Sequence, residues 1–275
     1  MWKVFGEAAE AECQRSNALE RDRIHELGGI IGAEDVSLEI AGGELFVIMG
    51  LSGSGKSTIV RTLNGLIPPT SGQIIIDNVD VASCDKETLR EVRRKKITMV
   101  FQHFALFPHK TIIDNVAFGL KLKGMGKEER HELARASLAK VGLEAYANSY
   151  PSQLSGGMQQ RVGLARGLAN DPEILLMDEP FGALDEIVRD HLNEQLLKLW
   201  AKTRKTVVFV THSIPEAVFL STRIVVLCPR PGRIYDVIES DLPRERTLDI
   251  RETPEFLKIA HRVREGLRAG HSYDD

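Results

Sequence analysis

Apolar residues gather into short, fully apolar runs that are separated by longer stretches of mixed character. The clearest run, Leu45 to Met49, ends at Gly50 and predicts a strand buried on both faces of a parallel sheet. Further runs predict strands at 74–76, 97–101, 174–177 and 206–210. Buried strands alternating with helical segments are typical of an α/β fold.

A different pattern precedes the first buried run. Val36, Leu38 and Ile40 alternate with polar residues, as expected for a strand with one buried face. The pair Gly42-Gly43 then predicts a turn that leads into the next strand.

Helical periodicity dominates two other parts of the chain. Residues 111–148 hold two helical patterns, over 111–123 and 127–141, and indicate a helical insertion within the strand-and-helix domain. A third helix is predicted to start at Thr253, where a hydroxyl cap is followed by Pro254 at the first helical position.

Composition narrows the class of protein. The 275 residues are 43% apolar and 27% charged, which suits one substantial globular domain with a small appendage. The net charge of −3 predicts no bulk attraction to nucleic acid. No segment approaches the roughly 18 apolar residues of a membrane span, and the acidic N-terminal segment is not expected to be a secretory signal. The three scattered cysteines fit a reducing compartment.

The residues that follow the first buried strand match the phosphate-loop pattern G-x-x-x-x-G-K-[ST]. Glycines allow successive N–H groups to converge on phosphate oxygens, and the next helix directs its positive end at the same anion. Lys56 is expected to reach the β- and γ-phosphates, and the Ser57 hydroxyl to ligate Mg²⁺. The alternative, an ordinary glycine turn, does not explain the flanking strand and helix. The candidate nucleotide-binding residues are Gly50, Ser52, Gly53, Ser54, Gly55, Lys56, Ser57 and Thr58.

Two carboxylates follow the predicted strand 174–177. Asp178 and Glu179 lie at its carboxyl end, where open α/β sheets place their ligands. Alone, such a pair would indicate only a solvated strand end. Together with the phosphate loop it predicts that Asp178 holds Mg²⁺ through water and that Glu179 acts as a general base on the attacking water.

Two other predicted strands end on polar residues. Gln102 follows the strand 97–101, and His212 follows the strand that ends at Thr211. In one sheet both would lie beside Asp178, near the γ-phosphate. We expect Gln102 to contact Mg²⁺ or the attacking water, and His212 to donate to the γ-phosphate, although a single residue of either kind is usually just solvated.

The segment from Leu154 to Arg161, Leu-Ser-Gly-Gly-Met-Gln-Gln-Arg, resembles the signature sequence of ATP-binding cassette (ABC) proteins. The resemblance covers nearly the whole chain, because all the family's elements occur in order: the phosphate loop, Gln102, the signature, Asp178-Glu179, Asp185 and His212. It implies an ATP hydrolase that uses ATP and Mg²⁺. The implied fold is a P-loop NTPase cassette with a RecA-like core, an antiparallel β subdomain and a helical subdomain.

The resemblance also implies a dimer. Ser155, Gly156 and Gly157 open a helix and form a second anion site, which would be redundant within one chain. The family dimerises head to tail, so that each signature completes the partner's phosphate loop. Asp185 resembles the residue that links the two sites, while Ser155 also suits a plain helix cap.

One feature departs from the family's pattern. Its members carry an aromatic residue that stacks on adenine before the first strand pair, whereas Leu27 to Ile31 offer only glycine and aliphatic residues. Two alternatives stay open here. Either Ile30 or Ile31 contacts the base, or an aromatic residue arrives from the N-terminal segment.

Local similarities point to importers. Trp2 to Gly6 and Glu91 to Lys96 resemble the glycine betaine/proline importer ATPases, whereas Glu179 to Asp185 and Arg230 to Ile234 resemble the taurine, sulfonate and nitrate group. We favour a quaternary amine (glycine betaine, proline betaine or choline) as the transported solute, with such an anion as the alternative. Cassettes that act on DNA or the ribosome, exporters and small-molecule kinases lack these features.

The importer resemblance implies further partners and a location. The expected partners are an integral-membrane permease and a solute-binding protein, on the cytoplasmic side of the cell's inner membrane, with no nucleic acid. Phe104, Leu106 and Phe107 are candidates for a groove that holds a permease helix, or else for packing between subdomains. The expected division is an N-terminal extension 1–27, an ABC domain 28–240 with its helical part at about 111–160, and a C-terminal helical extension 241–275.

Overall fold

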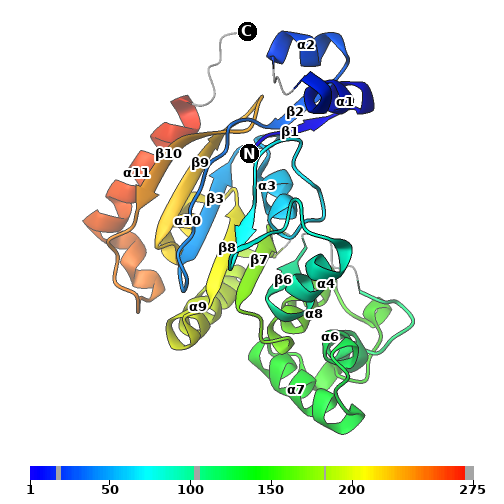
Figure 1. The fold of residues 1–275 in the computed structure, drawn as a ribbon. Helices are drawn as coiled ribbons and strands as arrows, with labels where there is room; N and C mark the ends of the chain where they lie inside the picture. The colour runs from blue at the N-terminus through cyan, green and yellow to red at the C-terminus, as the bar shows by residue number, and fades with distance from the viewer. Residues whose placement is uncertain (17–19, 102–105, 183, 270–275) are drawn as a thin grey trace.

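The computed structural model describes residues 1–16, 20–101, 106–182 and 184–269, and it is built around a six-stranded sheet (Figure 1). The strand order is β10-β9-β3-β8-β7-β6, with all neighbours parallel except the antiparallel pair β9–β10. The strands are β3 (Leu45–Gly50), β6 (Ile97–Val100), β7 (Ile174–Asp178), β8 (Thr206–Thr211), β9 (Arg223–Cys228) and β10 (Arg233–Glu239).

The sheet is buried on both faces, as its fully apolar strands predict. Successive side chains of a strand point to opposite faces. Leu45, Val47 and Met49 of β3 therefore enter one hydrophobic core, while Phe46 and Ile48 enter another. The α/β fold class is confirmed.

Helices cover both faces of this sheet (Figure 1). Helices α3 and α4 contribute to the core that contains Phe46, and α8 to α11 contribute to the opposite core. The helices are α1 (Glu7–Ser16), α2 (Arg21–Glu26), α3 (Lys56–Leu63), α4 (Lys86–Lys95), α5 (Ile112–Val116), α6 (Phe118–Leu122), α7 (Lys127–Lys140), α8 (Gly156–Ala169), α9 (Glu186–Thr203), α10 (Ile214–Leu220) and α11 (Pro254–Ala269), with short 3₁₀ helices at Glu144–Tyr146, Pro151–Gln153 and Leu248–Glu252.

The strand predicted over Val36, Leu38 and Ile40 does not form. The chain runs there without strand pairing, although Val36 is buried and the other two side chains pack against the core around Phe46. The alternation therefore gave the correct buried face. It could not show whether a neighbouring strand was available to pair.

The prediction over 74–76 was only partly correct. Its strand is the short β4 (Ile75–Ile76), which pairs with β5 (Val79–Asp80) outside the central sheet. Asp77 and Asn78 join the two with positive φ angles of 46° and 66°, as a tight hairpin turn requires.

The N-terminal segment is tied to the cassette by a second two-stranded sheet. Strand β1 (Lys3–Phe5) pairs antiparallel with β2 (Ile30–Ala33), and α1 and α2 lie between them in the chain. Arg21 of α2 donates two hydrogen bonds, of 2.6 and 2.7 Å, to the Glu34 carboxylate just after β2. This salt bridge anchors the second helix beside the cassette.

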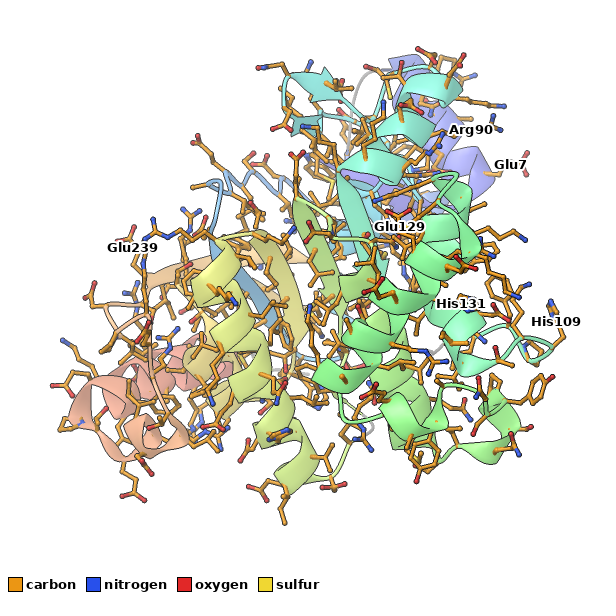
Figure 2. All side chains as sticks on the ribbon, turned by 90° about the horizontal axis from the view of Figure 1, so that it is seen from below. Glu7, Arg90, His109, Glu129, His131 and Glu239 are labelled. Atoms are coloured by element: carbon orange, nitrogen blue, oxygen red, sulfur yellow. The ribbon has the colours of Figure 1, made fainter. Side chains whose placement is uncertain are left out.

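The predicted helical insertion is helical in the structure. The first pattern, 111–123, is divided into α5 and α6 at Ala117, and the second forms α7. From below, α7 with Glu129 and His131 lies on the opposite side of the molecule from Glu239, which ends β10 (Figure 2). Within the described ranges, no helix combines the length and apolar character needed to cross a bilayer.

Candidate functional site

The phosphate loop joins β3 to α3 in a conformation that only glycine adopts easily. Gly53 and Gly55 have φ angles of 78° and 79°. A β-carbon on Gly55 would also lie 2.3 Å from the carbonyl oxygen of Gly32, and one on Gly50 would lie 2.3 Å from Ser54 Oγ. The glycines are therefore needed both for the turn and for close packing.

Lys56 is held within this loop. Its ammonium group donates to the carbonyl oxygens of Gly50 and Leu51, both at 2.9 Å, and lies 3.9 Å from Glu179 Oε1. Burial lowers the pKa of Lys56, against the opposing effect of the Glu179 and Asp178 carboxylates. Among the described residues, Lys56 is hydrogen-bonded to these two backbone carbonyls and lies in salt-bridge range of Glu179, so phosphate oxygens can replace them.

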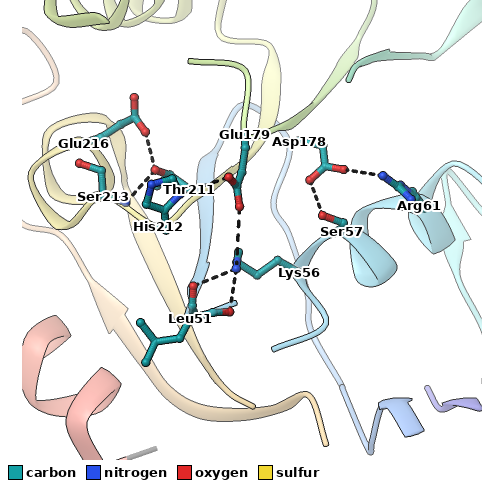
Figure 3. A network of polar contacts seen from close by, with 11 residues as sticks. Leu51, Lys56, Ser57, Arg61, Asp178, Glu179, Thr211, His212, Ser213 and Glu216 are labelled. Carbon is teal, nitrogen blue, oxygen red and sulfur yellow. Dashed lines mark hydrogen bonds and ion pairs between the residues drawn. The ribbon is translucent and has the colours of Figure 1, made fainter. Parts of the chain in front are cut away.

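Asp178 is fully buried at the end of β7, where two residues of α3 meet it (Figure 3). Ser57 Oγ donates a 2.7 Å hydrogen bond to Asp178 Oδ1, and Arg61 Nη2 lies 3.4 Å from Asp178 Oδ2. A buried carboxylate needs such compensation. The structure thus brings together the predicted metal ligands Ser57 and Asp178.

Glu179 and His212 face each other beside Lys56 (Figure 3). His212 Nδ1 lies 3.1 Å from Glu179 Oε2, and the Glu179 side chain is 17% exposed. Glu179 has a strained backbone, with φ of 47°, and its N–H donates to the Val210 carbonyl at 3.2 Å. The hydrogen bond to β8 holds Glu179 in this strained conformation, in which its carboxylate lines the pocket.

The phosphate loop, Glu179 and His212 line one pocket of about 660 Å³, while the buried Asp178 lies behind Ser57. Gln102, which was predicted to follow a neighbouring strand, lies outside the described residues, as does Phe104. The pocket is lined by Leu51, Ser52, Gly53, Ser54, Gly55, Lys56, Ser57, Thr58, Glu179 and His212.

The donor set suits magnesium held together with a phosphorylated substrate. In the described ranges, no three His, Cys, Asp or Glu side chains gather in a way that could hold a metal ion. Ser57 and Asp178 instead offer two hard oxygen donors. Mg²⁺ typically takes one or two protein oxygens and completes its shell with water and substrate phosphates.

The predicted second anion site lies elsewhere on the chain. Ser155 caps α8, and its hydroxyl accepts from the Met158 N–H at 3.3 Å. Asp185 caps α9 in the same way, through the Val188 N–H at 3.0 Å. Ser155, Gly156 and Asp185 are exposed, and none of them lines the phosphate pocket.

An aromatic residue of the N-terminal segment lies close to the phosphate loop. Phe5 pairs with Ile30 across β1 and β2, and its ring covers Gly32. A β-carbon on Gly32 would lie 2.5 Å from Phe5 Cε2 and 3.5 Å from Thr58 Cγ2. This placement makes Phe5 a candidate for stacking on adenine. Of the aliphatic alternatives, Ile31 is buried, whereas Ile30 is 67% exposed and stays a candidate.

The sequence reasoning missed several residues of this region. Arg61 could have been suspected, because it lies one helical turn after Ser57 on α3. Gly232, in the turn between β9 and β10, carried no such signal. Its carbonyl accepts from the Glu34 N–H at 2.8 Å, and it packs on Ser54 and Gly32.

Comparison with known proteins agrees with this geometry. A family model described as "ABC transporter" matches residues 33–182. The glycine betaine/proline betaine transport system ATP-binding proteins ProV of Escherichia coli and Salmonella typhimurium are 49% and 53% identical, over 97% of this chain and 70% of each relative. The glycine betaine transport ATP-binding protein OpuAA of Bacillus subtilis is 51% identical over 86% of this chain and 56% of its own.

Solved structures extend the similarity to three dimensions. The ATP-binding cassette MJ0796, in a dimeric post-hydrolysis state bound to ADP and phosphate, has a TM-score of 0.74 and 37% identity, over 86% of this chain and 95% of its own. A second dimeric structure of that cassette has a TM-score of 0.73 and 42% identity, over 77% of this chain and 91% of its own. By sequence, fold and site, the chain belongs to the ABC transporter family as an ATP-binding, ATP-hydrolysing subunit.

Proposed function

We propose that this chain hydrolyses Mg-ATP in a head-to-tail dimer and thereby drives an importer of glycine betaine, proline betaine or a related quaternary amine. It would act at the cytoplasmic face of the membrane with a permease and a solute-binding protein. The observation that carries the choice of solute is the 49–53% identity to two betaine transport ATPases over 97% of the chain.

The pocket supports the proposed hydrolysis residue by residue. The loop amides and Lys56 would hold the phosphates, and Ser57 with Asp178 would hold Mg²⁺. When bound, Mg²⁺ offsets negative charge on the phosphates. Glu179, partly exposed and 3.1 Å from His212, is placed to accept a proton from water. His212, which lines the pocket, would orient that carboxylate.

Phe5 is the proposed stacking surface for adenine. Its ring is partly exposed, borders the phosphate loop through Gly32 and Thr58, and carries the Lys3 ammonium 5.1 Å from its centre. Bases stack on aromatic rings with little dependence on their identity. Phe5 would therefore supply affinity, and the phosphate loop would supply orientation.

The exposed caps support the proposed dimer. Ser155 with Gly156 and Gly157 presents unpaired N–H groups at the start of α8, outside the pocket of its own chain. In a head-to-tail pair this helix end would approach the partner's γ-phosphate. Asp185 and the 83% exposed Ile187 lie on the first turn of α9, where a partner would cover them.

A second candidate solute is a taurine, sulfonate or nitrate-like anion, favoured by Arg230 to Ile234. The cassette does not touch the solute, so the binding protein must decide. We would purify Glu179→Gln in mild detergent with Mg-ATP, identify the co-purifying permease, and express the solute-binding protein encoded with it.

Calorimetry with glycine betaine and with taurine then separates the two candidates. Binding of betaine supports the proposal, and binding of taurine alone overturns the choice of solute. Recovery of no membrane protein would contradict the transport role. Lys56→Ala, purified identically, serves as the control, because it should lose the nucleotide-dependent capture.

A further inference from the structure

Glu216 is a buried carboxylate for which the proposed hydrolysis has no use. It lies in the first turn of α10, and only 5% of its surface is exposed. A buried ionisable group is costly unless its surroundings compensate it. Glu216 is hydrogen-bonded to the loop that carries His212, and its helix packs against α9.

The first contact leads to the loop that carries His212 (Figure 3). Thr211 Oγ1 donates a short hydrogen bond to Glu216 Oε2, and the same hydroxyl oxygen accepts from the Ser213 N–H at 3.0 Å. Both neighbours of His212 are thus tied to Glu216. His212 in turn lies 3.1 Å from Glu179.

The second contact, between α10 and α9, is one of packing. Asn193, which is fully buried, and Arg189 lie on α9, but in the described ranges neither Glu216 Oε1 nor the Asn193 amide has a hydrogen-bond partner. Arg189 Nη2 donates to the Leu184 carbonyl at 2.9 Å, directly before Asp185. Burial raises the pKa of Glu216, while Thr211, Arg189 and His212 each lower it.

We infer that Glu216 is a positioning residue that holds the His212 loop through Thr211 and so sets where His212 meets Glu179. The Thr211 hydroxyl joins the buried carboxylate to the residues on both sides of His212, and this geometry carries the inference. The inference rests on the proposed function, since its readout is ATP hydrolysis by the dimer.

The test removes the charge of the buried carboxylate. Glu216→Gln keeps the shape of the side chain but replaces the charged acceptor of the Thr211 hydrogen bond with a neutral one. We expect kcat to fall about tenfold while the KM for ATP changes less than about twofold, because the lost interaction acts in the reaction and not in binding.

Two further variants keep the test decisive. Asp190→Asn, which breaks the α9 salt bridge to Arg251 away from the pocket, should leave kcat unchanged. Thr211→Val removes the same hydrogen bond without changing Glu216 and should lower kcat to a similar extent. It keeps the test decisive if Glu216→Gln folds poorly. Wild-type kcat in both Glu216→Gln and Thr211→Val would overturn the inference. Lack of hydrolysis by the wild type would instead contradict the proposed function.

Discussion

At the scale of single residues, the charged side chains of the site have partners within the protein itself. Lys56 rests on two carbonyl oxygens, and Asp178 is held by Ser57 and Arg61. Such pairing keeps the loop and the carboxylate near the geometry that the phosphates and the metal would need. The conformational entropy of these side chains is then lost when the protein folds and not when ATP binds.

Phe5 gives a direct prediction about nucleotide affinity. Phe5→Ala should weaken ATP binding by about 1–3 kcal/mol, or roughly 5- to 150-fold, because a stacking surface is lost. Phe5→Trp should bind at least as well as the wild type. Calorimetric titration with ATP measures both, and Tyr146→Ala, a half-exposed aromatic in the helical part, is the matched control. Unchanged affinity in Phe5→Ala would return adenine recognition to the other alternative.

Glu216 gives a prediction about stability and pH. Its pKa in the folded protein is raised above the ordinary value of 4.5, mainly by burial. Folding therefore favours the protonated form, and this contribution to stability is present below pH 4.5 and lost as the pH rises through the raised pKa. Glu216→Gln mimics the protonated form, so its melting temperature should equal or exceed that of the wild type at pH 7.5.

Thermal melts of both proteins between pH 4 and pH 8 check this sign. The difference in favour of Glu216→Gln should shrink as the pH falls toward 4. A wild type that melts several degrees above the variant at pH 7.5 would show that the partners of Glu216 outweigh its burial. Together with a reduced kcat, a stable Glu216→Gln would mark a residue kept for function at the expense of stability.

At the scale of elements, the phosphate loop is shaped by two backbones that pack against it. A β-carbon on Gly232 would lie 2.6 Å from the Ser54 carbonyl oxygen and 2.7 Å from that of Gly32. Gly232→Ala should therefore displace the loop and weaken ATP binding by about tenfold or more. Gly42→Ala is the control, because nothing lies within 4 Å of the added carbon. Equal ATP affinities in the two variants would show that the loop holds its shape alone.

The elements also show what the sequence could predict. Fully apolar runs such as Leu45 to Met49 gave the central strands, because burial on both faces leaves a strong signal. The strand expected over Val36 to Ile40 failed, since alternation reports a buried face and not a pairing partner. Strands β9 and β10 were not predicted, although Ile224 to Leu227 is a comparable apolar run.

The site was predictable to a similar degree. The residues of the phosphate loop, Asp178, Glu179 and His212 share short motifs or strand ends. The structure places the loop, Glu179 and His212 around one pocket, and Asp178 against Ser57 of that loop. Contacts between distant segments left no mark in the sequence. Phe5 over Gly32, Gly232 on Ser54, and Glu216 beside Thr211 depend on how the elements pack.

At the scale of the whole molecule, the proposed dimer would bring the phosphate pocket of one copy to the exposed start of α8 of the other. Ser155→Arg places a bulky cation at that helix end, outside the pocket of its own chain. We expect this variant to bind ATP with wild-type affinity and to lose at least about 100-fold in hydrolysis, because the partner's site stays incomplete. Ser152→Arg, three residues earlier and also exposed, is the matched control. Normal hydrolysis in Ser155→Arg would contradict a composite site.

The most direct test of a nucleotide site shared by two copies is the mass of Glu179→Gln in solution, measured by light scattering with and without Mg-ATP. The variant should bind ATP but hydrolyse it about 100-fold or more slowly, since its general base is gone. We expect the mass of a single chain, 30.6 kDa, without nucleotide and twice that mass with Mg-ATP. Lys56→Ala should have the mass of one chain under both conditions. A Glu179→Gln protein that is saturated with ATP and still has the mass of one chain would contradict the shared site.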